Sequence, residues 1–132
     1  MAHGEDENTS FAPATQVVHL GRDPFRFDGF VNTPVVRGST VLSPTYDDLV
    51  NHRGRYSYGR HGNPTTEGLE TALQALEGSD GVVLTPSGLS AISIALLSVL
   101  EAGDHLLVSD SAYRPTRRLC DTVLKRLGVE TT

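Results

Sequence analysis

From Asn63 onward, helix-like and strand-like segments alternate along the sequence, and this alternation constrains the fold more than any other feature. Their order is a helix at 63–78, a strand at 81–85, a helix at 87–102, a strand at 105–110, a helix at 113–128 and the start of a strand at 129–132. Such alternation is typical of a parallel sheet covered by helices. The sequence therefore predicts an α/β fold, with a third strand that begins where the chain ends.

Local signals set the expected limits of these segments. Asn63 is the expected N-cap of the first helix, Pro64 occupies its first position, and Gly78 is placed to end it. The helix at 87–102 is apolar on most sides, which predicts that other parts of the fold cover it. In the last helix, the predicted buried face carries Leu119, Val123 and Leu127.

The N-terminal part of the chain has a different pattern. Residues 1–15 are predicted to form a flexible tail, and residues 16–62 are rich in Gly, Pro, Arg and Asn, with no helix of normal length expected. A long irregular stretch is unusual inside a compact domain. We therefore expect residues 1–62 to be a tail and extended arm that contacts another chain, and residues 63–132 to be the first part of a large domain.

Composition excludes several classes of function. The 132 residues carry a formal net charge of −5, which argues against nucleic-acid or acidic-membrane partners. The polar start of the chain lacks the apolar core of a secretory signal, and the apolar run at 91–100 is too short to span a bilayer. Cys120 is the single cysteine, and the five histidines show no metal-ligand spacing. These features favour a cytoplasmic protein without a metal site.

The turn "TPSGL" at 85–89 is the first candidate binding site. A strand that feeds a helix through a small turn leaves backbone N–H groups unpaired, and these donors favour an anion. Gly88 would let a ligand approach the backbone closely. The alternative interpretation is that Ser87 simply caps the helix. The spacing matches neither a dinucleotide-binding nor a P-loop fingerprint.

Two further stretches contain side chains suited to binding. In "RYSYGRHGNP", Tyr58 and Arg60 could bind a phosphate or a carboxylate, although a solvated basic loop is the alternative. Tyr113 follows the second predicted strand, at the sheet edge where parallel sheets bind ligands. Its ring could stack on a flat cofactor or pack over the sheet edge.

Together these stretches resemble one family, the Cys/Met-metabolism group of pyridoxal-phosphate (PLP) enzymes. The resemblance covers about residues 15–132 and rests on "YGRHGNPTTEGLETALQALEG", "TPSGLSAI" and "GDHLLVSDSAYRPTRRLCDTVLKRLGVETT". It implies the start of the large domain of the aspartate-aminotransferase-like fold (fold type I). Within the group, "GFVNTPVVRGSTVLSPTYDDL" and "SAYRPTRRLCDTVLKRLGVETT" most resemble bacterial cystathionine β-lyases.

The resemblance implies a role for each candidate residue. Backbone N–H groups of Gly88 and Leu89 would hold the PLP phosphate, and the ring of Tyr113 would stack on the pyridine ring. Tyr58 and Arg60 match a Y-x-R pair that reaches the phosphate of a neighbouring subunit, and Tyr58 could also tune proton transfer. Family members form homotetramers built from such dimers, which would account for the extended arm.

The resemblance also implies an activity, the β-elimination of L-cystathionine to homocysteine, pyruvate and ammonia. The alternatives are a cystathionine γ-synthase, a cystathionine γ-lyase or a methionine γ-lyase of the same family, or a truncated chain without activity. The lysine that binds PLP covalently in the family lies beyond the residues matched here. Lys125, the only lysine, falls in the last turn of a helix and does not match it. We therefore expect the isolated 132 residues to be inactive.

Overall fold

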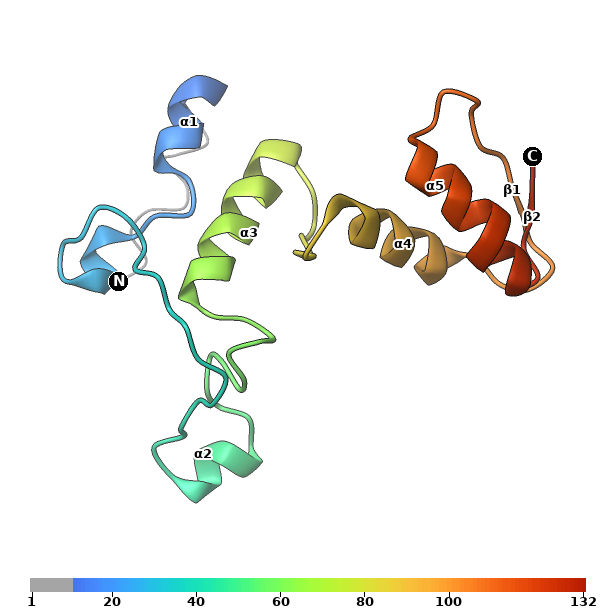
Figure 1. Ribbon diagram of the computed structural model, residues 1–132. Helices are drawn as coiled ribbons and strands as arrows, with labels where there is room; N and C mark the ends of the chain where they lie inside the picture. Colours follow the sequence, from blue (N-terminus) through green and yellow to red (C-terminus); the bar gives the residue numbers. More distant parts are fainter. Residues whose placement is uncertain (1–10) are drawn as a thin grey trace. The chain divides into compact units, whose positions relative to one another are not determined.

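The computed structural model describes residues 11–132 of the chain (Figure 1). These residues form two compact units, which meet in the sequence between Val83 and Leu84. Each unit has its own helices, and each is described by itself below. No helix in the described range is long and apolar enough to cross a bilayer.

The first unit is helical, with loops between its helices. Its elements are α1 (Pro13–His19), the 3₁₀ helix η2 (Pro24–Phe27), α2 (Tyr46–Val50) and α3 (Pro64–Glu77). The three elements described before α3 have seven, four and five residues, which confirms that residues 16–62 contain no helix of normal length. The predicted tail at 1–15 needs a correction, because its last residues belong to α1; its first ten lie outside the described range.

Helix α3 begins and ends where the sequence predicts. The side-chain oxygen of Asn63 accepts hydrogen bonds from the N–H groups of Thr65 and Thr66, and the Thr66 hydroxyl accepts one from the Asn63 N–H. This reciprocal arrangement is a capping box that satisfies donors at the helix start. At the other end, Gly78 adopts a left-handed conformation with φ of 62°.

Helix α1 packs on α3, and the segment that follows α1 makes a close contact with α3 between two glycines. A Cβ atom added to Gly21 would lie 1.9 Å from the carbonyl oxygen of Gly68. Gly21 also has φ of +71°, a conformation that costs other residues energy. The absence of side chains at both positions therefore allows the segment after α1 to lie directly against α3.

The second unit contains two parallel strands and two helical segments. Its elements are α4 (Gly88–Val99), β1 (His105–Leu106), α5 (Arg114–Leu119), the π-helical segment η3 (Cys120–Leu124) and β2 (Glu130–Thr131). The strands pair in register as His105 with Glu130 and Leu106 with Thr131. The α5–η3 segment connects them, so the structure confirms the predicted parallel pairing and the α/β fold class.

A small apolar core holds the second unit together. Cys120, Leu124 and Val129 are buried, and Leu96, Leu100, Leu106 and Val108 pack against them. Burial raises the pKa of the Cys120 thiol, and the neighbouring charge of Asp121 adds to the effect.

The buried face of the last helix differs from the predicted one by one residue. Cys120 and Leu124 point inward, while Leu127 is half exposed.

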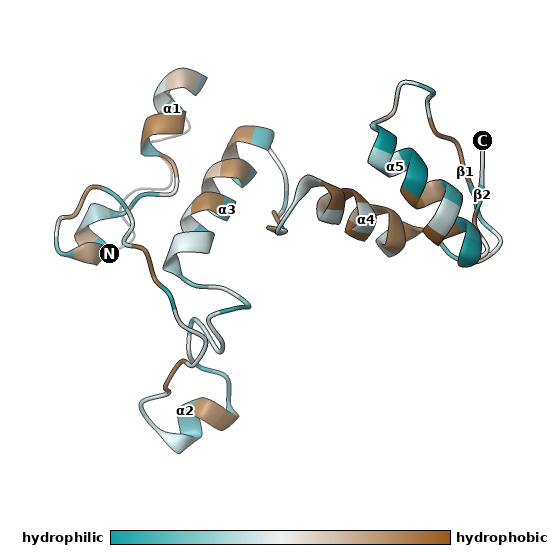
Figure 2. Cartoon of the chain, viewed as in Figure 1, coloured by the Kyte–Doolittle hydropathy of each residue, from teal (hydrophilic) through white to brown (hydrophobic). Residues whose placement is uncertain are grey.

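Three expectations about this region are wrong in the structure. Residues 81–85 form no strand, since an extended segment becomes a strand only when a neighbour pairs with it and no described residue does so. Helix α4 has no fully buried residue, although it is apolar along most of its surface (Figure 2). It also ends at Val99, before the expected stop near Gly103.

Candidate functional site

The turn before α4 is built by local hydrogen bonds. Ser87 is the N-cap, and its Oγ accepts a hydrogen bond from the N–H of Ser90 at 3.1 Å. The Ser87 carbonyl accepts hydrogen bonds from the Thr85 hydroxyl at 3.0 Å and from the N–H of Ala91 at 3.0 Å. The capping interpretation of Ser87 is thus confirmed, and the geometry of the turn is fixed by three short contacts.

The same turn leaves two donors available. Within residues 11–132, no acceptor is found for the N–H of Gly88 or that of Leu89. A Cβ atom added to Gly88 would meet no atom within 4 Å, so the space beside its backbone is open. Unpaired donors at the start of a helix attract anions, because the helix dipole adds to their partial charge. The turn therefore fits a phosphate group such as that of PLP.

Tyr113 lies between β1 and α5 in the second unit. Its side chain is 64% exposed, and its carbonyl accepts hydrogen bonds from the N–H groups of Thr116 and Arg117 at 2.8 and 3.2 Å. Its backbone is thus held by the first turn of α5, while its ring remains accessible to a ligand. Tyr113 follows β1 in the chain, as predicted, but β1 ends at Leu106 instead of at residue 110, so residues 107–112 form a loop between the strand and Tyr113.

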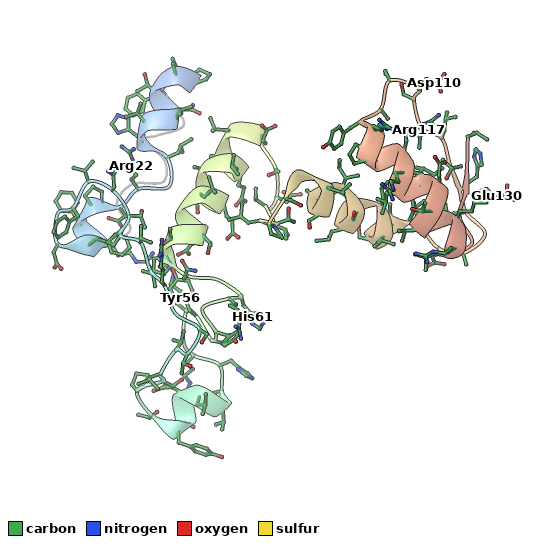
Figure 3. All side chains as sticks on the ribbon, viewed as in Figure 1. Arg22, Tyr56, His61, Asp110, Arg117 and Glu130 are labelled. Atoms are coloured by element: carbon green, nitrogen blue, oxygen red, sulfur yellow. The ribbon has the colours of Figure 1, made fainter. Side chains whose placement is uncertain are left out.

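An arginine on α5 secures the loop that leads to Tyr113. The Arg117 guanidinium donates hydrogen bonds to the Val108 carbonyl and to the Asp110 carboxylate, both at 3.1 Å (Figure 3). One planar side chain therefore connects the helix to two residues of the loop, Val108 and Asp110. This contact was not predicted from the sequence, although the opposite charges on either side of Tyr113 were a signal for it.

Helices α4 and α5 contact each other, which brings parts of the candidate site together. Leu89 and the first-turn residues Arg114 and Pro115 line one shallow depression, which continues along α5. The turn before α4 and the residue after Tyr113 therefore belong to one surface of the second unit.

Tyr58 and Arg60 lie together in the first unit. Tyr58 pairs with Thr40 in an antiparallel bridge, and the Arg60 guanidinium lies 4.6 Å from the centre of the Tyr58 ring. The His61 ring contacts the Tyr58 ring in a T-shaped arrangement, with 5.2 Å between the ring centres. Arg60 is exposed, so its guanidinium is accessible for an anion while its contact with Tyr58 limits its freedom.

Residues just before Tyr58 and Arg60 in the sequence belong to a cluster around Glu67. The role of Glu67 as the centre of this cluster was not predicted from the sequence. The Glu67 carboxylate accepts hydrogen bonds from the Arg55 guanidinium and the Tyr56 hydroxyl, and the Arg26 guanidinium lies 3.5 Å from it. Arg26 also donates to the Tyr56 hydroxyl at 3.1 Å. These residues come from η2, from the loop before α3 and from α3 itself, so no local pattern links them.

The cluster stabilises the ionised form of Glu67. Partial burial alone would raise the pKa of the carboxyl, but hydrogen bonds from Tyr56 and Arg55 and the charges of Arg55 and Arg26 outweigh it and lower the pKa. The same contact with Glu67 raises the pKa of Arg55. Glu67 therefore remains a carboxylate at neutral pH.

Among the residues described, no group of His, Cys, Asp and Glu could hold a metal ion.

Comparison with known proteins agrees with these features. Residues 14–132 match the family model of the Cys/Met metabolism PLP-dependent enzymes. A Rhizobium johnstonii protein with the provisional name cystathionine beta-lyase is 53% identical over 116 residues, which cover 88% of this chain and 29% of that protein. A cystathionine gamma-synthase of Mycobacterium bovis is 38% identical over 120 residues, covering 91% of this chain and 30% of the relative.

A solved structure shows the same fold. The crystal structure of metB from Corynebacterium glutamicum superposes with a TM-score of 0.85 at 35% identity, and the match covers 96% of this chain and 32% of that one. The chain thus spans about a third of the length of the proteins that it matches. The family model matches nearly all of the described residues, and the chain belongs to the family of Cys/Met metabolism PLP-dependent enzymes.

Proposed function

We propose that the protein is a PLP-dependent carbon–sulfur lyase that cleaves L-cystathionine by β-elimination into homocysteine, pyruvate and ammonia. The observation that carries the proposal is the family match over residues 14–132. The 53% identity with a protein provisionally named cystathionine beta-lyase favours this reaction. A cytoplasmic homotetramer with a phosphate site shared between subunits is part of the same proposal.

The second unit supplies the groups that hold and orient the cofactor. The N–H groups of Gly88 and Leu89 donate hydrogen bonds to the phosphate, since neither has an acceptor among the described residues. The exposed ring of Tyr113 would stack on the pyridine ring of the cofactor and orient it. When bound, PLP supplies an electron sink for the carbanion that forms after loss of the substrate α-proton.

The first unit supplies the side chains that complete the phosphate site of a neighbouring subunit. Arg60 binds the phosphate through its guanidinium, and Tyr58 adds a hydroxyl donor. Tyr58 also holds a proton close to the reacting carbons of the substrate. Lys125 has no part in this site, because it lies at the exposed end of the helix that follows η3.

A γ-elimination or γ-replacement is the second candidate, because the chain also matches a cystathionine gamma-synthase at 38% identity. The two reactions share the cofactor and differ in which carbon loses the sulfur. Product analysis separates them directly.

The test uses the protein as its gene encodes it, loaded with PLP and supplied with L-cystathionine. The β-lyase yields pyruvate and homocysteine, whereas a γ-lyase yields 2-oxobutyrate and cysteine. Chromatography of the keto acids distinguishes the two outcomes. Formation of 2-oxobutyrate without pyruvate contradicts the β-elimination, and formation of neither from cystathionine contradicts the lyase proposal.

A further inference from the structure

We propose that Glu67 is a positioning residue that holds the segment Tyr58–Arg60 in the conformation that binds the PLP phosphate. The inference rests on the proposed function and adds to it a residue that does not itself touch the cofactor. It follows from the contacts of the Glu67 carboxylate and from the way in which the chain is anchored just before the segment and at its middle residue, Gly59.

The carboxylate of Glu67 uses both of its oxygens. The Arg55 Nε lies 3.1 Å from Oε1, which the same guanidinium also reaches through Nη2. The Tyr56 hydroxyl donates to Oε2, and the Arg26 Nη1 lies 3.5 Å from that oxygen. A carboxylate with donors on both sides has one preferred orientation, so it fixes Arg55 and Tyr56 in turn.

Arg55 and Tyr56 precede the proposed phosphate-binding segment and are separated from Tyr58 only by Ser57. Within the segment, the Gly59 carbonyl accepts a hydrogen bond from the Asn63 side chain at 3.1 Å, and the Gly59 N–H donates one to the Ser39 carbonyl at 2.8 Å. The chain is therefore tied to α3 and its N-cap at two points, one just before the segment and one at its middle residue. Because the segment is short, these two attachments leave Tyr58 and Arg60 few other conformations.

Helix α3 thus holds the Tyr58–Arg60 segment in one conformation. Glu67 lies in the first turn of α3, where the positive end of the helix dipole favours a carboxylate. Its side chain is only 31% exposed, so its contacts with arginine are less weakened by solvent than those of a fully exposed pair. Arg60 itself is exposed, and its orientation depends on the backbone that Glu67 and Asn63 hold.

The test compares Glu67→Gln with Glu70→Gln in the protein as its gene encodes it. Glu70 lies on the same helix and has no hydrogen bond or ion pair among the contacts of the described residues. The Glu70→Gln variant therefore removes one negative charge from α3 but leaves the contacts of Glu67 intact. Two probes are used, PLP and pyridoxal, which lacks the phosphate. Their dissociation constants are measured by equilibrium dialysis, which requires no catalytic turnover.

We expect Glu67→Gln to weaken PLP binding about tenfold, a typical effect of losing charge-assisted hydrogen bonds that orient a ligand-binding group. Pyridoxal binding stays unchanged, because the segment contacts only the phosphate. Glu70→Gln leaves the affinity for both probes unchanged. A purely structural role of Glu67 would weaken both probes alike, and that result overturns the proposal.

A less disruptive variant keeps the proposal testable if Glu67→Gln does not fold. Tyr56→Phe removes one donor to Glu67 and keeps the ring, so we expect it to weaken PLP binding about threefold without changing pyridoxal binding. Wild-type protein that fails to distinguish PLP from pyridoxal overturns the proposed function together with this role. Wild-type protein that prefers PLP, with both variants retaining that preference in full, overturns the positioning role alone.

Discussion

The side-chain amide of Asn63 donates a hydrogen bond to the carbonyl oxygen of Gly59 at 3.1 Å. The other end of the same amide, Oδ1, accepts hydrogen bonds from the N–H groups of Thr65 and Thr66 at 3.0 and 3.2 Å. One residue therefore starts helix α3 and also ties the Tyr58–Arg60 segment to it. The two functions use different atoms, which makes them separable by mutation.

Replacement of Asn63 by Asp keeps the capping oxygen and removes the donor to Gly59. We expect Asn63→Asp to weaken PLP binding while α3 keeps its stability. Asn63→Ala loses both contacts and destabilises the helix start by about 1 kcal/mol. Hydrogen exchange of the backbone amides in α3 measures the stability of the helix start. Equilibrium dialysis with PLP measures the effect of the hydrogen bond between Asn63 and Gly59 on PLP affinity. Equal PLP affinities of Asn63→Asp and wild type would contradict the role of the tie.

Gly59 lies against a neighbouring loop and tolerates no side chain. A Cβ atom added there would lie 2.1 Å from the Gly38 carbonyl oxygen, so the backbone must move. We expect Gly59→Ala to weaken PLP binding roughly tenfold, because Tyr58 and Arg60 move with it. The matched control is Gly81→Ala, since a Cβ at Gly81 meets no atom within 4 Å. Equilibrium dialysis with PLP provides the measurement, and identical affinities of the two variants would refute the prediction.

The features that the sequence predicted correctly are those that local chemistry determines. The cap at Asn63, the stop at Gly78 and the cap at Ser87 each depend on a few neighbouring residues, and the structure shows all three. Residues 81–85 form no strand because pairing depends on a distant segment. The Glu67 cluster was missed for the same reason: Arg26 is 41 residues away from it in the sequence.

The site itself was predictable only in part. Opposite charges at Asp110 and Arg117 lie close enough in sequence to suggest a pair, but the second acceptor of Arg117 is a backbone carbonyl, which carries no sequence signal. The buried face of the last helix lies one residue beyond the predicted one and coincides with the π-helical segment Cys120–Leu124, an irregularity that a regular 3.6-residue period does not predict. Such local irregularities arise from packing rather than from a periodic pattern.

The turn at Ser87 and Gly88 separates stability from binding. Gly88 has open space for a Cβ and no positive φ, so Gly88→Ala is expected to leave the free energy of unfolding unchanged or to raise it by up to ~1 kcal/mol. The same methyl group blocks the approach of the phosphate, and PLP binding falls about tenfold or more. Ser87→Ala is the contrasting variant, since it loses the cap and destabilises α4 by about 1 kcal/mol. Urea unfolding and dialysis with PLP measure the two effects; a Gly88→Ala protein with wild-type PLP affinity would contradict the phosphate assignment.

The contribution of Glu67 to stability depends on pH. Its contacts lower the pKa of the folded carboxyl below the ordinary value of 4.5, so the stabilisation is complete above the unfolded pKa and is lost as the pH falls through the folded one. The difference in unfolding free energy between wild type and Glu67→Gln is therefore greatest at neutral pH and shrinks below about pH 4. Urea titrations of wild type and Glu67→Gln across this range test the prediction. A difference that stays constant down to pH 3 would rule it out.

Arg117 should affect cofactor binding in a manner unlike Glu67. Its guanidinium holds the Val108 carbonyl and the Asp110 carboxylate at once, both at 3.1 Å, and a lysine ammonium lacks the planar fork that reaches two acceptors. Arg117→Lys therefore loosens the loop before Tyr113, and hydrogen exchange of the amides at 109–112 becomes faster.

Because Tyr113 would contact the ring of the cofactor and not its phosphate, Arg117→Lys weakens PLP and pyridoxal binding to the same extent. We expect about fivefold for each, the effect of losing roughly one hydrogen bond. Arg126→Lys is the matched control, since its exposed side chain has no hydrogen bond or ion pair among the contacts of residues 11–132. A loss confined to PLP would show that Arg117 acts on the phosphate instead, and the assignment of the loop to Tyr113 would then fail.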